Sequence, residues 1–185
     1  MYLQVKITLQ NITPPVWRRI VLSDEITLLQ LHNIIQISFN WTNSHLYQFI
    51  IKGWNIDVEE GVVMDEKIGP LFIDTIPLKS FNLKEKESFK YWYDFGDDWM
   101  HQIVVEKVTE LGSEFPICLA GMRNAPPEDC GGPWGYEELM RKKIAKKLTR
   151  DEKEWLGDYD PEYFDIEEVN DVLSDEDCLN EEGFF

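Results

Sequence analysis

The stretch YWYDFGDDWMHQIVVE, residues 91–106, decides the fold of this chain. Apolar and polar side chains alternate on both sides of Gly96, which is the period of two that a half-buried β-strand shows. Glycine tolerates a positive φ and aspartate bonds its own backbone, so the GDD sequence is typical of a tight turn. The stretch therefore predicts a β-hairpin. One face of its two strands would carry Phe89, Tyr91, Tyr93, Phe95, Trp99, His101, Ile103 and Val105.

The residues before the hairpin predict two strands and a helix. Residues 2–9 alternate like a strand, and a second strand resumes over residues 16–22 after two prolines, which interrupt any ladder. We expect these two strands to form an antiparallel pair at a sheet edge. Thr27 is suited to cap the helix that follows. The apolar stripe of this helix is Leu28, Leu31, Ile35 and Phe39.

Two other regions are expected to be mainly irregular. Residues 54–70 show too little pattern to predict more than loop and short strand. Residues 115–135, FPICLAGMRNAPPEDCGGPWG, are rich in proline and glycine and are expected to form a loop too long for a simple connector. An amphipathic, basic helix over residues 136–148 follows that loop.

Length and charge indicate one folded unit. With 185 residues and 43% apolar content, the chain can close one hydrophobic core and not two. We predict an α+β fold: a single domain over residues 1–173 in which a mostly antiparallel sheet packs helices on one face. The net charge of −17 is uneven, because residues 151–185 hold fifteen acids and one lysine. Residues 174–185 are expected to be an acidic, loose tail.

Targeting features are not evident in the sequence. No apolar run approaches the length of a membrane span, and the first residues do not have the pattern of a secretory signal. Three cysteines are an odd number, which indicates reduced thiols rather than a disulfide framework, although a bridge between Cys118 and Cys130 stays open. We therefore expect a cytoplasmic protein that does not associate with membranes.

The hairpin holds a potential metal-binding set. Asp94, Asp97, Asp98 and His101 offer three carboxylates and an imidazole within eight residues. The two aspartates after Gly96 lie in the turn itself, where they can equally cap backbone amides, so we favour that interpretation and predict no metal and no cofactor. The alternative is a metal-dependent hydrolase or nuclease that uses this cluster. A histidine among apolar neighbours is more typical of a core residue than of a general base.

A second alternative is nucleic-acid binding through the basic helix. Its cations are Arg141, Lys142, Lys143, Lys146, Lys147 and Arg150. The acidic segment follows directly, so pairing within the chain is a simpler explanation, and nucleic acid is not favoured as a partner. Cys130, just before this helix, is a reactive thiol only if a base or a helix N-terminus lowers its pKa.

The aromatic and polar groups of the hairpin and the following loop are expected to converge on a ligand or partner groove. The candidate groove residues are Tyr93, Asp94, Asp97, Asp98, Trp99, His101, Arg123, Glu128, Asp129 and Trp134. This set lacks a complete catalytic constellation. Our leading hypothesis is therefore a non-catalytic binding module for an unknown protein or small-molecule partner, rather than an enzyme.

Five stretches resemble the root-inducing-plasmid (pRi) open-reading-frame-three-like family. They are PPVWRRI, LHNIIQISFNWTNSHLYQF, YWYDFGDDWMHQIVVE, CLAGMRNAPPEDCGGPWGYEEL and WLGDYDPEYFDIEEVN, within residues 14–170. The resemblance implies a compact α+β domain of the plasmid or transposon passenger type, sometimes labelled resolvase-like. We do not adopt that label, because a serine-recombinase nucleophile motif is not evident. Relatives often have a second cysteine where this chain has Asn124 and Ala125, which puts a metal site relying on that cysteine in doubt.

Overall fold

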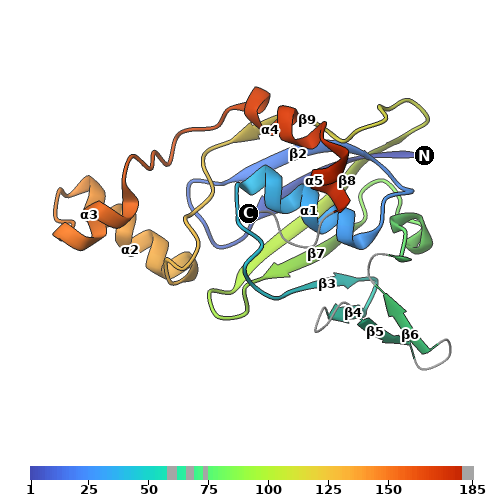
Figure 1. The fold of residues 1–185 in the computed structure, drawn as a ribbon, viewed down its shortest axis with the longest axis horizontal. Helices are drawn as coiled ribbons and strands as arrows, with labels where there is room; N and C mark the ends of the chain where they lie inside the picture. The colour runs from blue at the N-terminus through green and yellow to red at the C-terminus, as the bar shows by residue number, and fades with distance from the viewer. Residues whose placement is uncertain (58–61, 66–68, 73–74, 181–185) are drawn as a thin grey trace.

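The computed structural model describes residues 1–57, 62–65, 69–72 and 75–180. Its centre is an antiparallel seven-stranded sheet with the order β4-β3-β7-β8-β1-β2-β9 (Figure 1). The strands of this sheet are β1 (Tyr2–Leu9), β2 (Trp17–Ser23), β3 (Tyr47–Ile51), β4 (Trp54–Asp57), β7 (Ser88–Tyr93), β8 (Trp99–Thr109) and β9 (Ile117–Met122). A separate pair consists of β5 (Val62–Asp65) and β6 (Gly69–Phe72). The rest of the region for which we expected loop and short strand lies outside the described residues.

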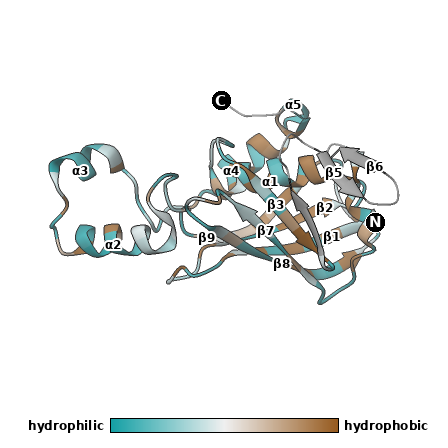
Figure 2. Ribbon diagram, turned by 90° about the horizontal axis from the view of Figure 1, so that it is seen from below, coloured by the Kyte–Doolittle hydropathy of each residue, from teal (hydrophilic) through white to brown (hydrophobic). Residues whose placement is uncertain are grey.

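The helices occupy two places. They are α1 (Leu28–Phe39), the 3-10 turn η2 (Leu78–Phe81), α2 (Gly132–Ile144), α3 (Arg150–Leu156), α4 (Ile166–Leu173) and α5 (Glu176–Asn180). Helices α1, α4 and α5 cover one face of the sheet, whereas α2 and α3 stand beyond its end (Figures 1 and 2). The predicted α+β class, with helices packed against an antiparallel sheet, is confirmed. Across the described residues, none of the helices combines the length and apolar character that crossing a bilayer requires.

The predicted hairpin is present as β7 and β8. Tyr93 pairs with Trp99, Tyr91 with His101 and Phe89 with Ile103, so these side chains share one face. That face is the buried one. The exception to the predicted set is Phe95, which lies in the turn and is exposed.

The predicted position of the first two strands is wrong, although their antiparallel pairing is right. β1 lies between β8 and β2, so it is an interior strand of the sheet. The edge strand on this side of the sheet is β9, which lies within residues 115–135, where the sequence predicts a loop. Proline and glycine around residues 115–135 masked its short alternation, in which Cys118 is buried while its neighbours are exposed.

Helix α1 begins as the sequence predicted and then binds the hairpin through polar groups. The Thr27 hydroxyl oxygen accepts a hydrogen bond from the backbone amide of Gln30, and the Gln30 side-chain oxygen accepts one from the backbone amide of Thr27, which forms a capping box. The Tyr91 hydroxyl lies 2.7 Å from His32 Nδ1 and accepts a hydrogen bond from Gln36 Nε2 at 2.9 Å. These groups are fully buried, so the contacts fix how α1 sits on the sheet.

The C-terminal segment docks on this layer. Leu173 at the end of α4 is fully buried, as is most of Leu179 in α5. Asn33 of α1 donates a hydrogen bond to the Leu179 carbonyl at 3.0 Å. We expected a loose chain from residue 174, but residues 176–180 form a docked helix, and residues 181–185 lie outside the described residues.

The edge strand β9 is closed by one side chain of α4. The Asn170 amide accepts a hydrogen bond from Cys118 N at 2.8 Å and donates one to Cys118 O at 3.0 Å. This is the pattern that a neighbouring strand would provide. Asn170 therefore satisfies backbone groups that would otherwise be open to another chain.

We predict that Asn170→Ala lowers the free energy of unfolding by about 1–3 kcal/mol, because it leaves both backbone groups of Cys118 without their partner. Urea unfolding followed by circular dichroism measures the change. The control is Asp171→Ala, which alters the exposed neighbour on the same helix. Equal stability of the two variants would show that the Asn170 contacts add nothing.

Candidate functional site

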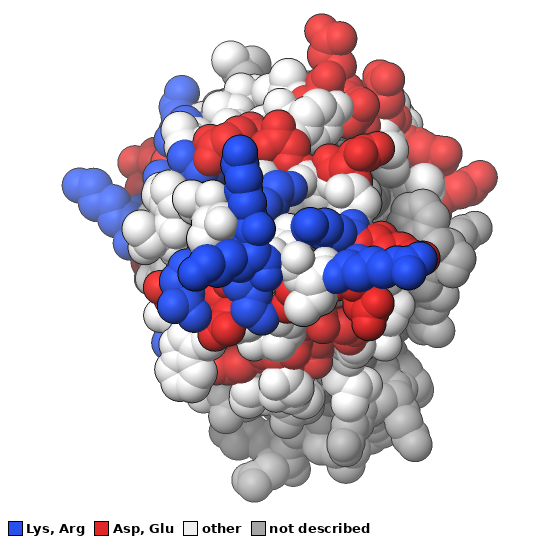
Figure 3. Space-filling view, turned by 90° about the vertical axis from the view of Figure 1, so that its left-hand side faces the viewer, with Lys and Arg blue, Asp and Glu red and all other residues white. Residues whose placement is uncertain are grey.

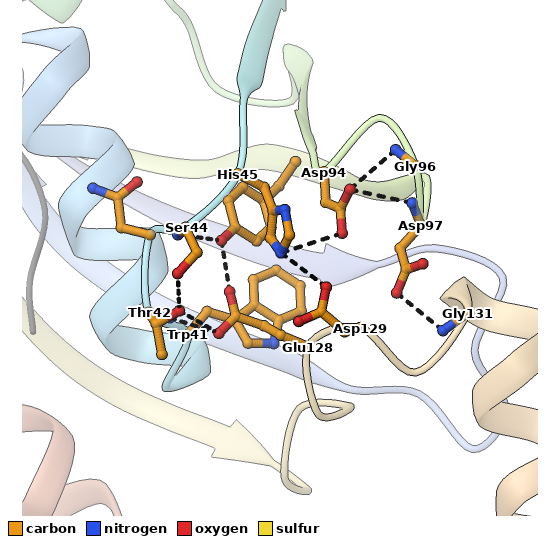
Figure 4. A network of polar contacts seen from close by, with 12 residues as sticks. Trp41, Thr42, Ser44, His45, Asp94, Gly96, Asp97, Glu128, Asp129 and Gly131 are labelled. Carbon is orange, nitrogen blue, oxygen red and sulfur yellow. Dashed lines mark hydrogen bonds and ion pairs between the residues drawn. The ribbon is translucent and has the colours of Figure 1, made fainter.

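Three segments meet at the end of the sheet beside the hairpin turn. They are residues 40–46 after α1, residues 94–98 of the turn, and residues 123–131 after β9 (Figure 4). We call their meeting point the junction. It contains polar side chains from all three segments, so it is the place to test the groove that the sequence predicted.

Glu128 holds two of these segments together. Its Oε1 accepts a hydrogen bond from the Tyr93 hydroxyl at 2.6 Å, and its Oε2 accepts two from Thr42, at 2.9 Å from N and 2.8 Å from Oγ1. The amide of Ser44 donates to the same Tyr93 hydroxyl at 3.1 Å. Burial, and then the Glu128 carboxylate, raise the pKa of Tyr93 well above its ordinary value. The phenol therefore stays protonated and acts as a donor.

Trp41 forms the floor below this contact. Its indole Nε1 donates a hydrogen bond to the Pro126 carbonyl at 2.9 Å. Its ring stacks on Tyr93 with the centroids 5.1 Å apart. The floor is rigid because the ring is almost completely buried and its polar atom is satisfied.

The hairpin turn occupies one carboxylate oxygen of Asp94, and the other oxygen takes no part in the turn. Asp94 has a left-handed backbone with φ of 52°, and its Oδ1 accepts hydrogen bonds from the amides of Gly96 and Asp97 at 3.0 and 3.3 Å. This is the turn-stabilising role that the sequence suggested. Oδ2 points instead into the junction (Figure 4).

The loop before α2 is fixed to the same turn. Asp97 Oδ2 accepts a hydrogen bond from Gly131 N at 3.1 Å. Gly132 has φ of +69°, and a Cβ at this position would lie 2.1 Å from the Asp97 carbonyl oxygen. Only glycine permits so close an approach of the two backbones, so position 132 requires a glycine.

His45 is the site residue that the sequence analysis missed. Its Nε2 lies 3.2 Å from Asp129 Oδ1 and 3.7 Å from Asp94 Oδ2 (Figure 4). Neither contact has hydrogen-bond geometry, so this shielded nitrogen has no hydrogen-bond partner in the described chain. His45 ends the polar run TNSH, residues 42–45, and its distance from the hairpin in sequence gives no sign that the two meet.

Two of the predicted groove residues belong to the core. Trp99 and His101 are fully buried, and His101 packs edge-on against Phe39 and Trp41. Burial lowers the pKa of His101 to about 3. The structure therefore does not bring His101 together with the turn aspartates.

Three further candidates make none of the junction contacts described above. Arg123 forms an ion pair with Glu162. Trp134 on α2 is 85% exposed. Asp98 is an exposed turn residue with φ of 59°. The structure thus brings together Tyr93, Asp94, Asp97, Glu128 and Asp129 from the predicted set, and adds His45.

Cys118 and Cys130 are free thiols. Cys118 and Cys130 are unpaired with each other, so the bridge left open by the sequence is absent between these two described residues. Burial, and then the nearby Asp97, raise the pKa of Cys130 to about 12. This thiol is therefore protonated at neutral pH and is not an activated nucleophile.

A hollow adjoins the junction between its loop and the helices α2 and α3. Its volume is about 330 Å³, which lies within the range of small-molecule sites. Its lining residues are Asp129, Cys130, Gly135, Glu138, Leu139, Lys142, Glu152 and Trp155. Asp129 therefore belongs both to the junction and to the wall of this hollow.

The architecture defines an α+β domain with a cluster of polar side chains at one end of its sheet. The profile of the plasmid pRiA4b ORF-3-like proteins matches residues 1–168. The chain belongs to this family.

Two similar proteins support the assignment. An uncharacterised protein of Sinorhizobium fredii, y4hQ, is 37% identical over 180 residues, which are 93% of this chain and 90% of that protein. The crystal structure of a protein of unknown function from Methanosarcina mazei, MM3350, superposes with a TM-score of 0.75 at 38% identity. That match covers 91% of this chain and 96% of the archaeal chain. These names carry no activity, so the function rests on the site itself.

We predict a stability loss in mild acid from two buried histidines. Burial lowers the pKa of His32 and of His101 from 6.5 to about 3. Below pH 6.5 the unfolded chain therefore takes up protons that the folded chain excludes, so the free energy of unfolding decreases as the pH is lowered. At pH 5 the expected loss relative to pH 7.5 is about 2 kcal/mol per histidine.

Urea unfolding at the two pH values measures this loss. His101→Phe retains an aromatic ring but no titratable group, so its acid-induced loss should be about 2 kcal/mol smaller than that of the unaltered chain. An unchanged pH dependence in this variant would contradict a neutral, buried His101.

Proposed function

We propose that this protein is a non-catalytic binding module, and that its ligand presents an organic cation, an ammonium or guanidinium group, to the hollow beside the junction. The observation that carries the proposal is the composition of the hollow. Three carboxylates, Asp129, Glu138 and Glu152, line it together with Lys142 as the single cation, and Trp155 adds an aromatic wall. Carboxylates and an indole are the groups that attract such cations.

The charges of the hollow are only partly neutralised within the chain. Lys142 lies 2.7 Å from Glu152 and 3.5 Å from Glu138, so its charge is shared between these two. Asp129 contacts no lysine or arginine in the described part of the chain. Its side chain is 73% exposed, which leaves it accessible to a ligand.

The chemistry of the lining supports binding rather than catalysis. Cys130 is the nucleophile type present in the wall, and its raised pKa keeps it as a thiol. The hydrolase or nuclease that we considered needs His101 beside the turn aspartates, but this side chain is enclosed by Phe39 and Trp41. The geometry thus gives that alternative less support than binding.

Nucleic-acid binding through the basic helix also has less support. Lys and Arg gather over the end of the molecule formed by α2 and α3, with acidic side chains around them (Figure 3). Arg141 lies 3.4 Å from Glu138, and Lys142 contacts two glutamates. Lys143 donates a hydrogen bond to the Tyr159 carbonyl. Carboxylates therefore offset the charges of Arg141 and Lys142, which weakens the attraction of this surface for phosphates.

The test uses a cation and its neutral counterpart. We expect N-acetyl-arginine methylamide to shift the indole NMR resonance of Trp155 in a saturable titration, while the citrulline analogue, which has the same shape without the charge, does not. Trp155→Ala should weaken arginine binding about fivefold, the effect of a cation–π contact of about 1 kcal/mol.

The matched control is Trp134→Ala. Trp134 is a more exposed tryptophan on the neighbouring helix and does not line the hollow. Its removal should leave arginine binding unchanged. Equal binding of arginine and citrulline analogues, or equal effects of the two tryptophan variants, would refute an organic-cation site in the hollow.

A further inference from the structure

We propose that His45, Asp94 and Asp129 form a binding site for one divalent metal ion at the junction, a site distinct from the organic-cation hollow. One imidazole nitrogen and one oxygen from each carboxylate lie within 4.8 Å of one another. The three residues come from three different segments of the chain, so the fold assembles the set. Asp129 is the member shared with the hollow.

The separations match those around a small metal ion. Ligand atoms placed tetrahedrally at 2.0–2.2 Å from a metal ion lie about 3.4 Å apart. The distances from His45 Nε2 to Asp129 Oδ1 and Asp94 Oδ2, 3.2 and 3.7 Å, bracket that value. The longest separation within the set is at most 4.8 Å. A small movement of the exposed Asp129 side chain would shorten it to the distance that a bound ion requires.

The state of His45 is an independent indication of a ligand. Its Nε2 is screened from solvent, yet it has no hydrogen-bond partner in the described chain. Buried polar atoms are nearly always satisfied, so an orphaned imidazole nitrogen needs an explanation. A metal ion between this nitrogen and the two carboxylates would satisfy all three groups at once.

The ligands are held in place before a metal arrives. Asp94 is 11% exposed, and its Oδ1 is fixed by the amides of Gly96 and Asp97, which directs Oδ2 toward His45. His45 lies next to Ser44, whose amide is fixed by Tyr93. The site therefore has two fixed ligands and one adjustable ligand.

The donor set indicates the class of ion. One imidazole with two carboxylates suits borderline divalent ions such as Zn²⁺ or Co²⁺ better than Ca²⁺, which prefers oxygen alone. Cys130 is not a member of this cluster, so the set offers no sulfur ligand to thiolate-seeking ions. A bound ion would join residues 40–46, the hairpin turn and the loop before α2, and would thereby strengthen the junction.

The experiment titrates Co²⁺ into the chelator-treated full chain and follows visible absorption and calorimetric heat. We expect one ion per chain, with no thiolate charge-transfer band, and a rise in melting temperature on binding. His45→Gln and Asp94→Asn should each weaken binding at least tenfold. Asp94→Asn is informative because asparagine tolerates the left-handed backbone and retains the oxygen that the turn needs.

The matched control is Asp98→Asn. It also removes one carboxylate from a left-handed position of the same turn, but outside the cluster, so Co²⁺ affinity should stay the same. If the unaltered chain binds no Co²⁺ at millimolar concentration, or if Asp98→Asn weakens binding as much as Asp94→Asn does, the site is refuted.

The two proposals fail separately. His45 and Asp94 do not line the hollow, so their substitution should leave arginine binding intact. Trp155→Ala, in turn, should leave Co²⁺ affinity intact. Loss of Co²⁺ binding alone would thus remove the metal site and keep the organic-cation site.

Discussion

The Tyr91 hydroxyl is the contact on which the junction depends. It lies in the buried interface between α1 and the hairpin, where it meets His32 Nδ1 and the amide of Gln36. His32 Nε2 lies 2.6 Å from Asn43 Oδ1, and Asn43 N donates to Gln36 Oε1 at 3.0 Å. An amide oxygen only accepts, so the proton of His32 is on Nε2 and the tyrosine donates to Nδ1. One buried polar network thereby fixes the segment that carries His45.

Strand alternation extends this constraint to the surface. Tyr93 is two residues beyond Tyr91 and therefore projects from the same face of β7, one step nearer the end of the strand. Its hydroxyl reaches Glu128 rather than α1 and so positions the loop after β9. One face of β7 thus positions two loops: Tyr91 acts on residues 40–46 from within the core, and Tyr93 acts on the loop after β9 at the edge of the core.

The features that depend on local periodicity could be predicted from the sequence. Contacts between segments far apart in the chain mostly could not. The hairpin and α1 were predictable because their apolar patterns and turn or cap residues agree. The contact of His45 with the turn was not, since it depends on the left-handed backbone of Asn43 and Asp94 and on the meeting of segments far apart in the sequence. At Arg18 the charge of the side chain and the strand alternation lead to opposite predictions, because the alternation places this cation on the buried face. The structure buries it, with Nε donating to the Ser38 carbonyl at 2.7 Å and the guanidinium stacked on Phe164.

The aspartates of the turn show why sequence alone could not separate a structural role from a binding role. A carboxylate has two oxygens, and the turn occupies only Oδ1 of Asp94. The hydrogen bonds that stabilise the turn also fix the direction of Oδ2, and this is the orientation that binding a ligand would need. The two interpretations of this residue are therefore not alternatives. Asp97 differs from Asp94 in this respect, because its Oδ2 accepts a hydrogen bond from Gly131 N and so attaches the loop before α2 to the turn.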